Sequence, residues 1–568
     1  MFSGPADKLM TRTEEDRVPT ETSGRAIHYG LLALILVVAT VLRVVNLGSQ
    51  ALWGDEGLTL VLAHWPVLDM LLEPTDPTPA LYYILHKYLL SADSSVEAIR
   101  SISLVCGIAS VALMYVFGRL AHGRWTGLLA AALLAVWPQH IDYSQEARTY
   151  ALLFLLTLAS ATSLLWWQRQ LGKEDGERLD RRRRLALVSF ALTTALTFYT
   201  HFVAIFWIAS AILIFRSIAQ SAKPRRMNET AFTLLAMAFL AAPGVFRLFR
   251  QMALPTNFSW LRQADPAEFA STTLATFLPL DAPRGATIML GVGIAQLFFV
   301  AIGLALLVQG SREKHRASRT GVDGVVQALT WAFLSLPLLI WVFGFFFRPI
   351  FMERTILFAI PGAILAILAA SVAAPGRQLG VAFGSLAVVA LFVSTLVGGT
   401  MRPRENWRGA QSALAQHVRP GDLILFCGWQ YPSLRHATQR PVPAPVVHMK
   451  ADLLEVVEDR LGGRSDWDHL YYRYNVQTET WGAPPLPLRP VRAELKAGAR
   501  LWYVKSECRG GDSSLASWVE PSKWRTLWAS PTTPARAGIE VSRYVLERPL
   551  ALPLSAPREL SWPPATLR

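Results

Sequence analysis

Apolar stretches long enough to cross a lipid bilayer recur along the first 400 residues of this 568-residue chain. Crossing about 30 Å of hydrocarbon takes roughly 20 helical residues. The composition agrees, because 17% of the residues are charged, against about 25% in a typical soluble domain. The sequence therefore predicts a polytopic α-helical membrane protein with about eleven transmembrane helices, at residues 27–47, 98–118, 125–141, 149–167, 185–202, 203–218, 230–248, 286–308, 325–347, 355–374 and 379–398.

The positions of Lys and Arg predict how these helices are oriented. Short basic loops stay on the cytoplasmic side of a membrane. Three loops of one parity are rich in basic residues: Arg169, Lys173, Arg178 and 181–184; Arg216, Lys223, Arg225 and Arg226; and Arg312, Lys314, Arg316 and Arg319. We therefore expect a cytoplasmic N-terminal tail over residues 1–25, a transmembrane domain over 26–400 and an outer domain over 401–568. The net charge of +14 is then an orientation signal and not a nucleic-acid-binding surface.

The outer domain is expected to have an α/β fold. Short apolar runs at 423–426 and 501–504 are typical of buried strands, and residues 406–418 between the last span and the first strand look helical. A strand, helix, strand order favours a small α/β domain. The Pro- and Arg-rich end from Pro549 onward is expected to be extended or disordered. Cys427 and Cys508 would pair as a disulfide only if the compartment is oxidising and their Cα atoms lie close, which leaves the pairing open.

Two acid-bearing segments, at 53–57 and 143–148, each follow an apolar run that begins on the basic side of the membrane. Both are therefore expected at the outer membrane surface. Ionisable groups close to hydrocarbon are costly, so by default they indicate a functional site. The loop at 48–97 also contains apolar stretches at 58–72 and 79–90, which are too short to span. They are predicted to be amphipathic helices lying in the interface plane.

Four motifs in and around these segments resemble those of a known group of membrane enzymes. They are Trp-Gly-Asp-Glu at 53–56, Asp-Pro-Thr-Pro-Ala-Leu-Tyr-Tyr at 76–83, Tyr-Ser-Gln-Glu-Ala-Arg-Thr-Tyr-Ala-Leu at 143–152 and Glu-Arg-Thr-Ile-Leu at 353–357. Over about residues 31–215 the chain is similar to glycosyltransferases of the GT-C superfamily. Within it, the chain resembles bacterial families 39 and 83, which are related to protein O-mannosyltransferases and lipid A aminoarabinose transferases.

The resemblance implies an inverting-type transfer of a sugar from a polyprenyl-phosphate donor to an acceptor at the outer face. The membrane it implies is a bacterial inner membrane, with the C-terminal domain in the periplasm. The acceptor is lipid A or core oligosaccharide, a protein, or another envelope glycan, and the sequence does not choose among them. The chain also departs from its relatives, because Tyr150 stands near where some branches carry an aspartate, and Ala80 where many have a proline.

Such a transfer requires a base near the acceptor hydroxyl and positive charge around the donor phosphate. We expect Asp55 to be that base. The other candidates are Glu56, Glu146 and Asp76 as support for the acceptor site, Arg148, Arg354 and His201 as ligands of the donor phosphate, and Trp53, Tyr82 and Tyr83 as sugar or lipid contacts.

Each candidate also has an ordinary structural interpretation. Acids at a helix start stabilise the helix, which would account for Glu56 or Glu146. Arg148 could extend to the interface from a helix end, Arg354 could pair with Glu353, and His201 could be a hydrogen-bonded helix-end residue. The aromatic residues could belong to an interfacial belt. The three acids at 55, 56 and 146 could ligate a hard cation, but the resemblance implies no metal and no other cofactor.

Two other functional classes would also account for a chain with many membrane spans. A transporter or flippase for a lipid-linked saccharide would need broken helices and a charged site near the bilayer midplane. The central parts of the predicted spans carry almost no acids or bases, and the acids lie at the outer interface instead. A third class makes the outer domain the working part and the spans an anchor, but that domain carries no nucleophile elbow or zinc motif.

Overall fold

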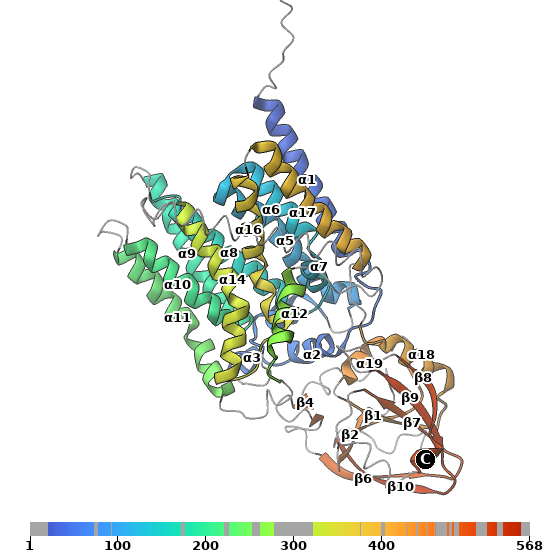
Figure 1. The fold of residues 1–568 in the computed structure, drawn as a ribbon. Helices are drawn as coiled ribbons and strands as arrows, with labels where there is room; N and C mark the ends of the chain where they lie inside the picture. The colour runs from blue at the N-terminus through green and yellow to red at the C-terminus, as the bar shows by residue number, and fades with distance from the viewer. Residues whose placement is uncertain are drawn as a thin grey trace, which may run out of the picture.

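The computed structural model of the chain contains a body of long helices and a domain built on a mixed β-sheet (Figure 1). The structure describes residues 21–72, 78–91, 94–171, 177–220, 227–252, 262–277, 322–374, 376–398, 404–428, 430–438, 441–450, 453–458, 461, 474–475, 480–481, 488–506, 520–530 and 538–557. The helices of the body are α1 (Glu21–Val44), α2 (Gly54–Ala63), α3 (Val67–Leu72), α4 (Leu81–Leu89), α5 (Val96–His122), α6 (Arg124–Ala135), α7 (Pro138–Ser144), α8 (Tyr150–Gln168), α9 (Glu177–Thr200), α10 (Ala204–Gln220), α11 (Met227–Met252), α12 (Pro266–Phe277), α14 (Val322–Phe346), α15 (Glu353–Ile356), η2 (Leu357–Ala359), α16 (Ile360–Ala373) and α17 (Arg377–Gly398).

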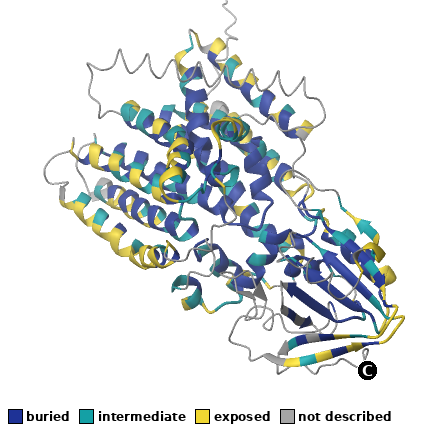
Figure 2. Ribbon diagram, turned by 60° about the horizontal axis from the view of Figure 1, so that its bottom comes forward, coloured by how far each residue is buried: buried dark blue, intermediate teal, exposed yellow. Residues whose placement is uncertain are grey.

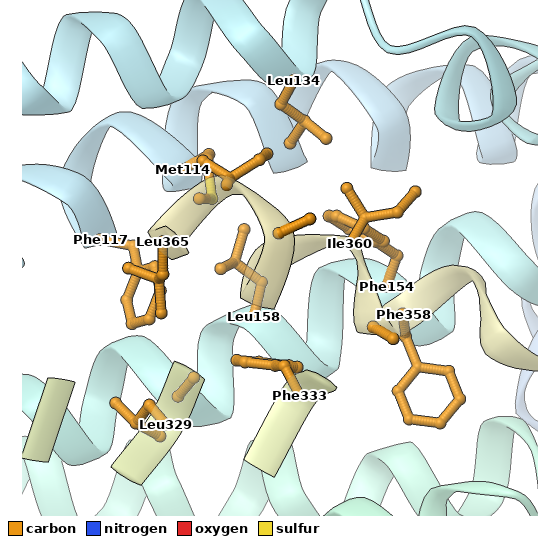
Figure 3. Packing of buried hydrophobic residues seen from close by; sticks show 14 of the residues in the cluster. Met114, Phe117, Leu134, Phe154, Leu158, Leu329, Phe333, Phe358, Ile360 and Leu365 are labelled. Carbon is orange, nitrogen blue, oxygen red and sulfur yellow. The ribbon is translucent and has the colours of Figure 1, made fainter. Parts of the chain in front are cut away.

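The core of the body lies around α16, which is apolar on all sides and packs against α5, α6, α14 and α17. A helix that is hydrophobic all round must be surrounded by other helices or by lipid. Figure 3 shows side chains from five helices and η2 meeting here: Met114, Phe117, Leu134, Phe154, Leu158, Leu329, Phe333, Phe358, Ile360 and Leu365. Gly362 allows α14 to approach, since a Cβ at this position would lie 2.7 Å from the Phe333 Cβ.

The outward faces of the helices are apolar as well. Phe232, Phe239 and Phe249 on α11 are 72%, 80% and 69% exposed, and Figure 2 shows exposed residues along the outside of the bundle. Contiguous apolar surface of this kind is rare in soluble proteins, whereas lipid tails solvate it. In the part that the structure describes, seven helices are long and apolar enough to cross a membrane: Arg25–Val44, Val96–His122, Tyr150–Gln168, Asn228–Met252, Val322–Phe346, Glu353–Ala373 and Gln378–Val397.

The predicted count of eleven spans is not confirmed. The span expected at 125–141 is wrong as a continuous helix, because α6 has only 12 residues, about 18 Å, and a new short helix begins at Pro138. Proline has no N–H to continue the helical hydrogen bonds. The buried Arg43 side chain donates instead to the carbonyls of Leu134 and Ala135, at 3.1 and 2.9 Å.

The other differences concern three more of the predicted windows. Those at 185–202 and 203–218 correspond to α9, which carries the arginine tract in its first turns, and to α10, which has 17 residues. Neither is among the seven long apolar helices. The window at 286–308 lies outside the described residues.

The loop after α1 forms short helices, but not the arrangement that the sequence indicated. The stretch at 58–72 is divided into α2 and α3 by Pro66, and α4 covers most of 79–90. The expectation that the first of these helices lies on the acyl boundary is wrong, because Leu60 and Val61 of α2 are buried in a cluster shared with the sheet domain. The apolar face of α2 therefore packs on protein, not on lipid.

The sheet domain contains eight strands in the order β6-β10-β3-β2-β1-β7-β9-β8. β1 lies in the middle and pairs in parallel with β2 and β7, as expected when a helix connects neighbouring strands. Ile424 and Phe426 face the cluster that contains α18 and α19, whereas Leu423 and Leu425 face the opposite side. The elements are α18 (Trp407–His417), β1 (Leu423–Cys427), α19 (Tyr431–Ala437), β2 (Val446–Lys450), β3 (Leu453–Glu458), β6 (Leu488–Leu495), β7 (Arg500–Lys505), η3 (Pro521–Lys523), β8 (Arg525–Ala529), β9 (Glu540–Val545) and β10 (Leu550–Pro557), with β4 (Tyr474–Asn475) and β5 (Thr480–Trp481) as a separate pair.

Several features expected of this domain can be placed on these elements. The apolar runs at 423–426 and 501–504 lie in β1 and β7, and the helix expected at 406–418 is α18. The stretch after Pro549 is extended, since β10 is a paired strand between β6 and β3 as far as Pro557. Cys427 is disulfide-bonded and Cys106 is a free, buried thiol, whereas Cys508 lies outside the described residues.

The sheet domain rests on the helical body through α19 and α2 (Figure 1). Gly57 of α2 lies directly under α19. A Cβ at Gly57 would lie 3.0 Å from the Ser433 backbone nitrogen and 3.3 Å from the Pro432 Cβ. Both are atoms of the α19 backbone or its proline, which cannot move aside as a flexible side chain can. Only glycine allows this approach, so the two parts of the chain share one packed core here.

Replacing Gly57 with alanine tests this junction. Overpacking of this kind typically costs about 1–3 kcal/mol, so we expect a lower melting temperature and faster proteolysis between the body and the sheet domain. Gly30→Ala on α1 is the matched control, because nothing lies within 4 Å of a Cβ added there. A melting temperature for Gly57→Ala equal to that of the wild type would mean that α19 does not rest on α2.

Candidate active site

Asp55 lies in the first turn of α2, at the end of the helical body that faces the sheet domain (Figure 1). Its Oδ2 accepts a hydrogen bond from Arg354 Nη1 at 2.8 Å, and Arg148 Nε lies 3.9 Å from the same oxygen. The three residues come from α2, from α15 and from the turn before α8, so only the tertiary fold brings them together. The side chains of Asp55 and Arg354 are 15% and 22% exposed, so the group is partly desolvated but accessible.

Arg148 is fixed by several acceptors. Its Nη1 donates to the Asp55 main-chain oxygen and to the Tyr83 hydroxyl, both at 3.2 Å, and its Nη2 donates to Thr78 Oγ1 at 3.5 Å. An arginine that only reached for the interface would extend toward water, whereas Arg148 is 5% exposed. Arg247 of α11 approaches the same segment and donates to the Thr78 carbonyl at 3.0 Å. Two guanidinium groups therefore lie at Asp55, and a third contacts Thr78, which Arg148 also contacts.

Glu56, the neighbour of Asp55, is a buried structural group. Its two carboxylate oxygens accept from Arg100 Nε and Nη2 at 2.8 and 2.7 Å, and from the Ala147 N–H at 2.8 Å. It also accepts from the Trp53 N–H, so the helix-capping interpretation holds for this acid. Burial favours the neutral acid, but the charge and hydrogen bonds of Arg100, with the charge of Arg404 and the Ala147 N–H, lower the pKa of Glu56 to about 2.

Glu146 also faces an arginine, but one that the sequence analysis did not select. Arg404 Nη1 lies 3.1 Å from Glu146 Oε2, and Arg404 Nη2 lies 3.5 Å from Asp142 Oδ1. Burial opposes the charge of Arg404, yet Glu146, Glu56 and Asp142 raise its pKa above the usual value. The same guanidinium lies 6.0 Å from the Trp53 ring. Glu146 therefore connects the turn that carries Arg148 to the first residues of the sheet domain.

The remaining sequence candidates lie at different distances from this group. His201 is half-buried between α9 and α10, where its Nδ1 accepts from the Val203 N–H and its ring lies 5.9 Å from that of Tyr150. Tyr83 contacts Arg148, but Tyr82 is fully buried and hydrogen-bonds Ser103, so it does not face the Asp55 group. Asp76 lies outside the described residues.

Sequence reasoning missed three arginines: Arg100, Arg247 and Arg404. For all three a signal was present: Arg100 and Arg404, for example, lie at the ends of predicted spans on the side opposite the basic loops. A basic residue placed against the orientation rule and close to hydrocarbon needs an acid partner. Arg247 carried the same signal, because it lies at the outer end of the span predicted at 230–248.

The arrangement suits a ligand that carries both a phosphate and a hydroxyl. Guanidinium groups bind phosphate oxygens with two or more parallel hydrogen bonds. The Asp55 carboxylate beside them is a proton acceptor in a partly desolvated position. Among the residues that the structure describes, no three His, Cys, Asp or Glu side chains gather as a metal site would require. The acids at 55, 56 and 146 instead each face an arginine.

No protein-family model matches the sequence, and no curated protein matches it significantly. Among solved structures, the chain is similar to ArnT from Cupriavidus metallidurans bound to undecaprenyl phosphate, with a TM-score of 0.50 and 14% identity over 90% of this chain and 98% of that one. A match to the oligosaccharyltransferase of Archaeoglobus fulgidus in the apo form has a TM-score of 0.46 and 13% identity over 73% of this chain. This chain spans 64% of that protein's length.

At 14% identity, the likeness to ArnT shows a shared fold. The resemblance that the motifs indicated is therefore confirmed at the level of fold, which extends over the sheet domain as well as the helical body.

The buried Glu56–Arg100 pair gives a prediction about stability. Removing one partner of a buried ion pair leaves an uncompensated charge, which costs about 3–5 kcal/mol. We expect Glu56→Gln to lower the melting temperature of the detergent-solubilised protein strongly, and the double variant Glu56→Gln/Arg100→Gln to lower it less than the two single changes added together. Additive effects in this cycle would contradict the direct coupling of the two side chains.

Proposed function

We propose that the chain is a membrane glycosyltransferase that moves a sugar from a polyprenyl-phosphate donor to a hydroxyl acceptor at the outer face of the membrane. The observation that carries this proposal is the contact of the Asp55 carboxylate with Arg354 and Arg148, at the end of the helical body next to the sheet domain. The fold shared with ArnT, whose solved structure contains undecaprenyl phosphate, supports the same class of donor.

The reaction is a single displacement with inversion at the anomeric carbon. The acceptor oxygen attacks that carbon, the bond from the carbon to the phosphate oxygen breaks, and polyprenyl phosphate leaves with the electron pair. Asp55 takes the proton of the acceptor hydroxyl, a contribution worth about 10² to 10⁴ in rate. Arg148 and Arg354 bind the phosphate, whose negative charge grows as the bond breaks. Glu56 and Glu146 act indirectly, through the arginines that position this loop.

The pairing of Arg354 with Asp55 suggests an order of events. The Arg354 guanidinium donates to Asp55 Oδ2 at 2.8 Å, so each group is already bound to the other when no donor is present. The donor phosphate is a diester with one negative charge, and its oxygens can accept two parallel hydrogen bonds from the Arg354 guanidinium, so it competes with Asp55 for that arginine. Binding of the donor would then release the Asp55 oxygen to accept the acceptor proton. The base becomes available only when the donor is bound.

The orientation that we propose has the N-terminus in the cytoplasm and residues 401–568 in the periplasm, in a bacterial inner membrane with about eleven spans. The arginine-rich first turns of α9 lie at the end of the body far from the sheet domain, which supports this orientation (Figure 1). The acceptor then approaches from the side of the sheet domain. The junction between α2 and α19 places that domain next to Asp55, which suits a role in covering the site or recognising the acceptor.

The central experiment measures transfer by the purified protein in lipid with a panel of radiolabelled polyprenyl-phosphate sugars. We expect Asp55→Asn to reduce transfer about 10² to 10⁴-fold. The affinity for polyprenyl phosphate should be unchanged or tighter, because Arg354 no longer pairs with a carboxylate. Asp69→Asn, in α3 of the same loop, is the control and should transfer normally. Unchanged transfer by Asp55→Asn would remove the proposed base, and donor crossing vesicles without bond cleavage would indicate a transporter.

A second experiment separates donor binding from proton transfer. A hydrogen bond to a charged group contributes about 1.5–3 kcal/mol, so Arg354→Gln should weaken the binding of polyprenyl phosphate about ten- to a hundredfold. Arg262→Gln is the matched control, since Arg262 is 75% exposed and pairs with Glu268. Equal dissociation constants for Arg354→Gln and the wild type would exclude Arg354 from the donor site.

A further inference from the structure

A second group of arginines lies at the opposite end of the helical body from Asp55. Arg25 and His28 are near the start of α1, Arg119 is in the last turn of α5, and Arg124 begins α6. Figure 1 shows this end of α1 far from the sheet domain. Together with Tyr29 and Tyr115, these residues line a cavity of about 310 Å³. Cavities that hold small ligands typically measure about 300–1,000 Å³.

The lining of this cavity carries positive charge and no carboxylate. Three of its six residues are arginines and none is acidic. In the described part of the chain, Arg119 and Arg124 form no ion pair, and the Arg124 guanidinium lies 5.6 Å from the Trp125 ring. The arginines at the other end of the body differ, because Arg100, Arg354 and Arg404 each pair with an acid.

His28 distinguishes this cavity from an ordinary basic surface. Its side chain is buried, with 3% exposure, and its Nε2 lies 2.9 Å from the Tyr115 hydroxyl. Its Nδ1 is buried and has no hydrogen-bond partner among the described residues. Rings of Tyr29, Tyr115 and Trp125 surround it at 5.4–5.7 Å and fix its orientation. A buried polar atom is normally hydrogen-bonded, so the His28 Nδ1 is available to bind a ligand in the cavity that this residue lines.

Membrane orientation alone does not explain this arrangement. The positive-inside rule requires only that basic residues gather on the cytoplasmic side, and the exposed residues Arg181 and Arg182 of α9 already satisfy it. This rule does not explain why arginines from three helices line one cavity together with a buried histidine. Basic cavities between membrane helices on this side are typical binding places for anionic lipid headgroups.

We propose that this cavity binds a phosphate group, separately from the site around Asp55. Arg119 and Arg124 supply the charge, and His28 supplies a donor from its Nδ1 when the Tyr115 hydroxyl donates to its Nε2. An anionic phospholipid of the surrounding leaflet and a soluble phosphate both present this chemistry. The site is independent of the transferase reaction, because no residue of the Asp55 group contributes to it.

The test uses the full-length protein and measures retention of phosphatidylglycerol and of phosphatidylcholine by native mass spectrometry, with inorganic phosphate as competitor. We expect preferential retention of phosphatidylglycerol, displaced by phosphate. Arg119→Gln/Arg124→Gln should weaken it about tenfold or more. Arg181→Gln/Arg182→Gln, which removes the same charge from the same side, should change it little.

The variant His28→Phe separates the contribution of the arginine charge to ligand retention from that of the histidine hydrogen bond. It keeps a ring and the net charge but loses both ring nitrogens. We expect this variant to weaken retention about tenfold, as for the loss of one hydrogen bond to a charged group. Activity at the Asp55 site should stay at the wild-type level in every variant and serves as the folding control. Phosphate binding without lipid retention would identify soluble phosphate as the ligand and support the site. Equal losses in the two double-arginine variants, or none in either, would overturn the proposal.

Discussion

The ion pair between Glu56 and Arg100 is the interaction on which the end of the helical body next to the sheet domain depends. Both side chains have no exposed surface, so the pair has lost the hydration of two charges, at a cost of several kcal/mol for each ion. Four donors offset that cost at the carboxylate, two from Arg100 and one each from the Ala147 and Trp53 backbones. Arg100 in turn donates to three carbonyls of the loop after α1. One pair thereby fixes α2, α5 and the turn before α8 relative to each other.

This pair also explains why two adjacent acids have different environments. Successive residues on a helix are rotated by about 100°, so when Glu56 faces α5, Asp55 must face another side. That side carries Arg354 and Arg148 and is partly exposed. The buried acid determines the conformation of the loop, and the conformation presents the accessible acid. The two acids therefore differ in their surroundings, since Glu56 is fully buried whereas the Asp55 side chain is 15% exposed.

The two ends of the helical body use arginine in different ways. At the end next to the sheet domain, Arg100, Arg354 and Arg404 are each within 3.1 Å of a carboxylate, and Arg404 links the sheet domain to the turn that carries Arg148. At the other end, Arg119 of α5 and Arg124 of α6 have no acid partner in the part of the chain that the structure describes. An arginine paired with an acid holds two segments of the chain together. An arginine without an acid partner is available to bind an anionic ligand or to orient the chain in the membrane.

Local pattern and composition were sufficient for the broad architecture. The long apolar windows identified seven helices that also appear in the structure, because hydrophobic length is a property of the sequence itself. The motif at 53–56 singled out Asp55, which lies in the first turn of α2, and its role stays a prediction. The short helix α6 was misjudged, since its end depends on Pro138 and on Arg43, which is 91 residues before Leu134. The face of α2 was misjudged because the surface that covers it, α19, is supplied by a distant part of the chain.

The sequence by itself determined that this is a multi-pass membrane protein with acids near one face and a small α/β domain after the last span. Only the tertiary structure decided which acid is buried and which is accessible, and which arginine each one meets. The physical reason is the distance along the chain between the residues that interact. Hydrophobic periodicity is local, whereas the environment of Asp55 is set by Arg354, 299 residues away, and that of Glu146 by Arg404.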